Sequence, residues 1–153
     1  MDYRGQTAVL SAILVLVGMF LVPAITEKAL AVIHATAKGV CGPDGQTRPC
    51  LFSLAERHLV VGDWISQPTK YGTFVTWSTK GAGLVPDEKG SVGYFLYPEG
   101  IHTRIAIVVL SFENPTFGSN KCGITYKEGE NTGGDCTAGK GMQAEFTYNL
   151  RVK

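Results

Sequence analysis

The feature that most constrains this chain is a run of 18 uncharged residues near the N-terminus, from Ala8 to Ile25. A helix over this run would be about 27 Å long, close to the roughly 30 Å hydrocarbon core of a bilayer. Three interpretations fit the run: a cleaved secretory signal, a single-pass membrane anchor, and the packing helix of a filament. All three bring this part of the chain to a membrane.

The apolar pattern continues beyond the uncharged run. Leu30, Ile33 and Ala37 are spaced like residues on one face of a helix, and Gly39 is a common residue just past a helix end. This spacing predicts a helix from about Gln6 to Lys38. Its first part is apolar on all sides, whereas its second part is amphipathic.

The stretch from Tyr3 to Val9, which leads into the apolar run, resembles the start of type IV pilin-like proteins, especially the TadE/TadG-like and archaeal pilin groups. Pro23 is similar to the proline that bends the helix of bacterial type IV pilins. The resemblance covers only the N-terminal part of the chain. It implies a membrane-inserted subunit that assembles with copies of itself, with helices in the filament core and β-rich heads outward.

In such a filament, apolar side chains would leave the lipid and pack helix on helix, and small residues would permit close approach. Residues 1–38 would then form a transmembrane or filament-core helix. The residues of this assembly helix would be Val9, Leu10, Ile13, Leu14, Leu16, Val17, Gly18, Phe20, Leu21 and Pro23.

The composition changes after Gly39, and residues 39–153 have the pattern of a β-rich head domain. The last segment, residues 145–153, alternates apolar and polar residues, as a strand with one buried face does. Further strands are predicted over residues 73–79, 91–97, 102–112 and 122–126, with turn signals between them. We therefore expect an α+β fold, in which a long N-terminal apolar helix is followed by an antiparallel β-sandwich head.

Four cysteines fall into two local pairs, Cys41 with Cys50 and Cys122 with Cys136. Three pairings are open, and the short loops favour the local one. Disulfides would place the head in an oxidising, extracytoplasmic space. A zinc site of four thiolates would need closer spacing within each pair.

Motifs that would carry chemistry are weak. The net charge of +1 argues against phosphate neutralisation on a nucleic acid. Residues 134–141 nearly match a phosphate-binding loop, but Gly141 follows Lys140 where that motif has Ser or Thr. The oxygen-rich residues 128–135 lack the spacing of an EF-hand.

The remaining candidates are isolated side chains. His34, His58 and His102 stand apart in the sequence, and no hydrolase or metalloprotease motif accompanies them. Trp64 and Trp77 fit either core positions or a sugar-binding platform.

Taken together, these patterns favour a structural role. We expect a subunit of an extracellular pilus-like filament that is inserted in the membrane before assembly and has copies of itself as partners. No enzymatic activity, metal, cofactor or nucleic acid is expected. The alternatives are a membrane-anchored or secreted β-sandwich binding module and, less favoured, an extracytoplasmic enzyme.

Overall fold

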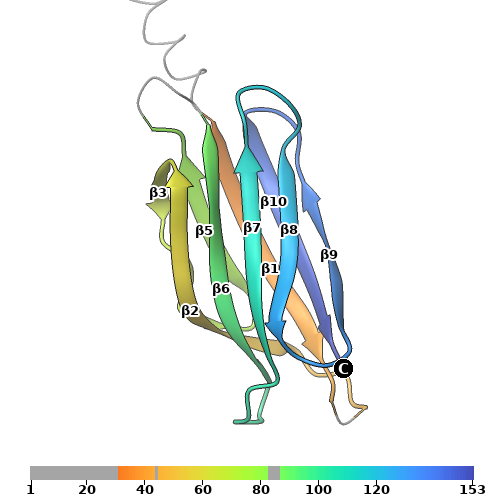
Figure 1. The fold of residues 1–153 in the computed structure, drawn as a ribbon. Coiled ribbons are helices and arrows are strands. Elements are labelled where there is room, and N and C mark those ends of the chain that lie inside the picture. The colour runs from red at the N-terminus through yellow and green to blue at the C-terminus, as the bar shows by residue number, and fades with distance from the viewer. Residues whose placement is uncertain (1–30, 44, 83–86) are drawn as a thin grey trace, which may run out of the picture. The chain divides into compact units, whose positions relative to one another are not determined.

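The computed structural model describes residues 31–43, 45–82 and 87–153 (Figure 1). Residues 31–153 form one compact unit. Ten strands make up this unit, and they form two five-stranded sheets that face each other. The described part of the chain is therefore an all-β sandwich.

The first sheet has the strand order β3-β5-β1-β10-β9. Strands β1 and β10 run parallel, and the other neighbours in this sheet are antiparallel. In chain order the bounds are β1 (Val32–Cys41), β3 (Asp63–Ser66), β5 (Val75–Lys80), β9 (Thr132–Ala138) and β10 (Gln143–Val152).

The second sheet has the order β4-β2-β6-β7-β8 and is antiparallel throughout. Its strands are β2 (Cys50–Val61), β4 (Tyr71–Gly72), β6 (Glu88–Pro98), β7 (Ala106–Asn114) and β8 (Lys121–Glu128). The predicted strand segments all lie within or overlap strands of the structure.

One apolar layer fills the space between the sheets. Alternate residues of β10, such as Phe146 and Tyr148, are fully buried, while the residues between them face outward. In the centre, the ring of Trp77 lies 6.0 Å from that of Phe112 and 5.6 Å from that of Tyr148. Aromatic contacts across the layer thus join the two sheets.

The prediction of an α+β fold with a helix reaching Lys38 is wrong, because Val32–Cys41 is strand β1 and the described residues contain no helix. Ile33, Ala35 and Ala37 are buried and alternate with outward residues, which is the period of a strand. Pairing with β5 on one side and β10 on the other satisfies the backbone of this strand. The predicted domain boundary, between residues 38 and 39, falls inside β1.

The proposed assembly residues, from Val9 to Pro23, lie outside the described residues. Within the part of the chain that is described, no helix is long and apolar enough to cross a membrane.

Both predicted disulfides are present, Cys41–Cys50 and Cys122–Cys136, and each joins one sheet to the other. The first connects the end of β1 to the start of β2. The second connects β8 to β9, which are the edge strands on the same side of the sandwich. This confirms the local pairing, and two disulfides indicate an oxidising, extracytoplasmic environment.

Tyrosine hydroxyls add hydrogen bonds from one sheet to the other. Tyr148 on β10 donates to the carbonyl of Ser111 on β7, and Tyr126 on β8 donates to the carbonyl of Gly133 on β9. Burial raises the pKa of both phenols, so both stay neutral donors at physiological pH.

Replacing both Cys122 and Cys136 by Ser should lower the free energy of unfolding by about 3 kcal/mol, because the bridge closes a loop with a sequence separation of 14. Denaturant unfolding of the variant against the wild type measures this. A variant with Cys41 and Cys50 replaced gives the comparison for the other bridge between the sheets, which closes a shorter loop with a sequence separation of 9. An unchanged unfolding midpoint after loss of Cys122–Cys136 would contradict the stapling role.

Candidate functional site

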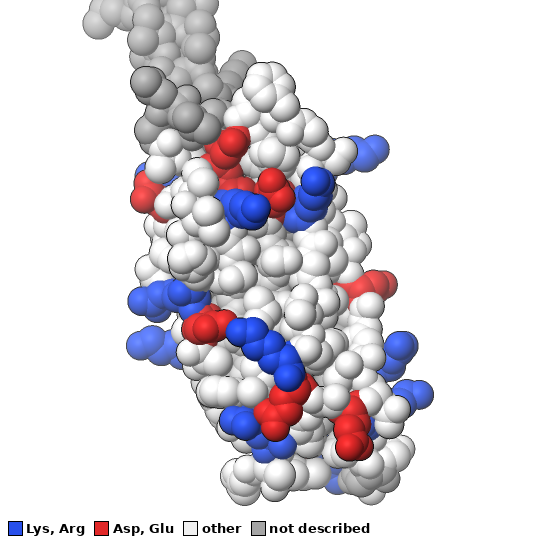
Figure 2. All heavy atoms as spheres, viewed as in Figure 1, with Lys and Arg blue, Asp and Glu red and all other residues white. Residues whose placement is uncertain are grey.

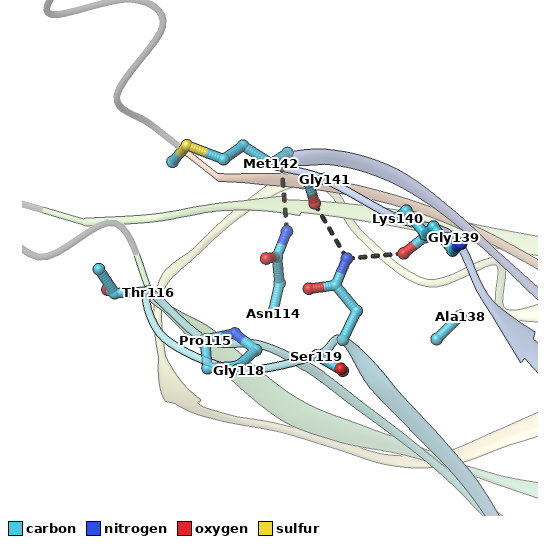
Figure 3. A pocket seen from close by; sticks show the side chains of 11 residues that line it. Asn114, Pro115, Thr116, Gly118, Ser119, Ala138, Gly139, Lys140, Gly141 and Met142 are labelled. Atoms are coloured by element: carbon cyan, nitrogen blue, oxygen red, sulfur yellow. Dashed lines mark hydrogen bonds between the residues drawn. The ribbon is translucent and has the colours of Figure 1, made fainter.

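Two chain connections form a pocket at one end of the sandwich. They are the β7–β8 connection, residues 115–120, and the β9–β10 connection, residues 139–142 (Figure 3). The pocket has a volume of about 450 Å³ and is lined by residues 114–116, 118–120 and 138–142. Cys122 and Cys136 each lie two residues from its lining, so their disulfide supports both walls.

Two asparagine side chains hold the walls together (Figure 3). The Asn120 amide nitrogen donates to the carbonyl of Gly139 at 2.6 Å and to that of Gly141 at 2.9 Å. The amide nitrogen of Asn114, a buried residue, donates to the carbonyl of Met142 at 3.1 Å. The pocket therefore has a defined shape set by polar contacts between the two connections.

Phe117 lies in the middle of the β7–β8 connection and is 90% exposed. The next residue, Gly118, has φ of 99°, a conformation that glycine adopts without strain. Residues 114–120 carry no charge, and the surface beyond the end of β7 and the start of β8 is white in Figure 2. An aromatic side chain is thus presented to the surroundings on an uncharged turn.

The lining of the pocket includes a charged residue. Lys140 is the one charged side chain among the described lining residues. Behind the β7–β8 connection, the Asp87 carboxylate accepts hydrogen bonds from the backbone N–H and the hydroxyl of Thr116. Asp87 therefore holds the base of the turn that carries Phe117.

Glu88, the residue after Asp87, is fully buried at the same end of the sandwich. One carboxyl oxygen accepts a hydrogen bond from the Thr79 hydroxyl, and within the described part of the chain the other has no partner. Burial raises the pKa of Glu88 to about 7, against the hydrogen bond from Thr79 that lowers it. This carboxyl is therefore poised to change its charge near neutral pH.

The structure does not gather the predicted chemical residues into one site. His34 lies on β1, His58 on β2 and His102 in the β6–β7 connection. Among the described residues, no group of three or more His, Cys, Asp or Glu side chains could hold a metal ion. In the acidic stretch 128–135, Glu128 makes an ion pair with Arg104 at 3.1 Å.

The two tryptophans contribute to packing. Trp77 is 1% exposed in the core, and Trp64 is half-buried with its ring 6.4 Å from that of Phe112. The phosphate-loop-like residues 134–141 run from β9 into a connection that leads to another strand, not to a helix. Of that stretch, residues 138–141 line the pocket.

The sequence analysis missed Phe117, Asn120, Asp87 and Glu88. The one sequence signal for an exposed aromatic side chain was Phe117 between Pro115 and Gly118, because proline and glycine favour a turn and turns lie at the surface. The burial of Glu88 follows from strand register, which no local pattern reveals.

The sequence matches no protein-family model and no curated protein. Several solved chains share the fold, and two of them cover most of this chain. One is the lipid binding protein Nakanori, with a TM-score of 0.59 and 9% identity over 78% of this chain and 70% of that one. The other is IP-1A from Alcaligenes faecalis, with a TM-score of 0.50 and 18% identity over 82% and 93% of the two chains.

Replacing Asn120 by Ala should lower the free energy of unfolding by about 1–2 kcal/mol, because two hydrogen bonds between the connections are lost. Replacing the exposed Asn149 on β10 by Ala is the matched control and should change little. Equal unfolding midpoints for the two variants would show that Asn120 does not join the walls.

Stability should fall as the pH rises from about 5 to about 8. The pKa of Glu88 is higher in the folded chain than in the unfolded chain. Its contribution to the free energy of unfolding is therefore fully present below about pH 4.5 and is lost as the pH rises through about 7. The free energy of unfolding falls by about 3 kcal/mol when this contribution is lost completely. Denaturant unfolding across this pH range measures it, and Glu88→Gln should flatten the profile. A Glu88→Gln profile as steep as that of the wild type would contradict the assignment.

Proposed function

We propose that residues 31–153 form an extracytoplasmic binding module that attaches to a lipid bilayer through the end that carries Phe117. In this proposal the neighbouring pocket takes a polar lipid headgroup. The observation that carries the proposal is the 90% exposure of Phe117 on an uncharged turn. In water this exposure is unfavourable, and burying a Phe side chain is worth roughly 1.5–3 kcal/mol.

Other apolar side chains lie at the same end. Met142, in the pocket wall, is 38% exposed. Val60 is 59% exposed near the end of β2, where Val61 pairs with Lys89 at the start of β6. Exposed apolar side chains that gather in one region are typical of interaction surfaces.

The uncharged run of the sequence is attached to this end as well. The first described residues, Ala31 and Val32, lie beside the pocket, because the Val32 N–H donates to the Met142 carbonyl at 2.6 Å. The chain segment that contains Ala8 to Ile25 therefore joins the sandwich at the end that presents Phe117. A bilayer facing this end suits both features.

The pocket offers groups that suit a headgroup. The Lys140 ammonium would attract a phosphate, and the Ser119 hydroxyl and nearby backbone N–H groups would donate hydrogen bonds. The likeness in fold to a protein described as lipid binding agrees with this proposal. The filament-subunit hypothesis stays a prediction, since its assembly residues lie outside the described ones.

The test places an indole at the tip of the turn. Phe117→Trp, in the full chain with phosphatidylcholine vesicles, should add emission that brominated phosphatidylcholine quenches strongly, because the ring enters the bilayer. Phe74→Trp is the matched control, since Phe74 is 56% exposed just before β5, in neither of the two pocket connections. Wild-type emission, from Trp64 and Trp77, is subtracted.

We expect strong quenching at position 117 and weak quenching at position 74. Equal quenching at the two positions, or none at position 117, would overturn the proposed orientation.

A further inference from the structure

Glu88 joins the two sheets at the pocket end of the sandwich. It is the first residue of β6 in the second sheet, and its carboxyl accepts a hydrogen bond from the Thr79 hydroxyl on β5, which belongs to the first sheet. Its side chain also lies against the backbone of Gly62, where an added Cβ would be 3.7 Å from the Glu88 Cγ.

Among the described residues this carboxyl has no charged partner. Thr79 and Gly62 are uncharged, and one carboxyl oxygen is buried with no hydrogen bond from any described residue. A buried carboxylate without a cation is strongly disfavoured, whereas the neutral acid costs far less. The arrangement therefore suits the protonated form.

Charged residues on the neighbouring strands point away from Glu88. On each of these strands the charged or titratable residue near Glu88 faces outward. These residues are His34 on β1, Lys80 on β5, Lys89 on β6 and Glu113 on β7. Asp63 follows Gly62 and is exposed. Asp87, adjacent in the chain, directs its carboxylate to Thr116. Glu88 is thus the one Asp, Glu, Lys, Arg or His residue that is buried among the described residues.

Glu88 is linked to both walls of the pocket. Asp87, the residue before it, binds Thr116 beside Phe117. The residue that pairs with Glu88 in the β6–β7 ladder is Asn114, whose side chain donates a hydrogen bond to the Met142 carbonyl in the other wall. A shift of the start of β6 would therefore disturb both connections.

We propose that Glu88 is a proton-controlled latch: the neutral carboxyl keeps the start of β6 docked and the Phe117 turn in its membrane-binding arrangement, and loss of the proton to solvent releases both. The inference rests on the proposed function, because the regulated property is attachment to a bilayer.

The size of the effect follows from linkage. With a pKa of about 7 docked and 4.5 in water, the ratio of released to docked protein rises about tenfold between about pH 6 and about pH 8. If only the docked form binds the bilayer, the apparent affinity for the bilayer falls by at most the same factor.

The experiment uses the full-chain Phe117→Trp variant with brominated phosphatidylcholine vesicles, whose headgroup does not titrate in this range. Quenching of the introduced indole should fall severalfold from about pH 6 to about pH 8. Adding Glu88→Gln should keep quenching high at both pH values, since the amide cannot ionise. Glu113→Gln, which removes an outward carboxylate beside Asn114, is the matched control and should keep the wild-type pH dependence.

A second readout separates this inference from membrane binding. Without lipid, the Thr116 amide resonance, which reports its hydrogen bond to Asp87, should titrate near pH 7 in the wild type and stay flat in Glu88→Gln. Absence of quenching at every pH, with this titration present, would overturn only the proposed function. A flat wild-type resonance, or pH-dependent quenching that survives Glu88→Gln, would overturn the latch, because His34, His58 and His102 are retained in that variant.

Discussion

The structure depends on holding two five-stranded sheets face to face over one apolar layer. Both disulfides cross that layer, and so do the hydrogen bonds of Tyr126 and Tyr148. Cys122–Cys136 also ties the strands that lead into the two pocket connections. Above that bridge, the pocket end is held by side-chain hydrogen bonds of Asn114, Asn120, Asp87 and Glu88, which break more readily than a covalent bond.

The strands could be predicted where one face is buried, because β10 alternates cleanly between apolar and polar residues. The disulfide pairing could be predicted because each loop is short. At β1 the reasoning failed because Leu30, Ile33 and Ala37 also fit a helical face. Only pairing with β5 and β10, which are distant in sequence, decides in favour of a strand. The pocket could not be predicted, since its walls meet through long-range contacts.

The pocket end combines features that are uncommon together. An exposed aromatic ring sits on an uncharged turn, a single lysine is among the described residues that line the neighbouring pocket, and a buried acid lies at the same end. The first two suit a surface with an apolar interior and polar headgroups. The third makes the same end sensitive to protons.

Hydrogen–deuterium exchange of the full chain, with and without phosphatidylcholine vesicles, tests the central claim most directly, because it reports which backbone amides a bilayer covers. We predict slower exchange in residues 115–120 and 139–142, and unchanged exchange in the β6–β7 connection, residues 99–105, at the other end of the sandwich. Protection of residues 99–105 in place of the two pocket connections, or no change in either, would contradict the account.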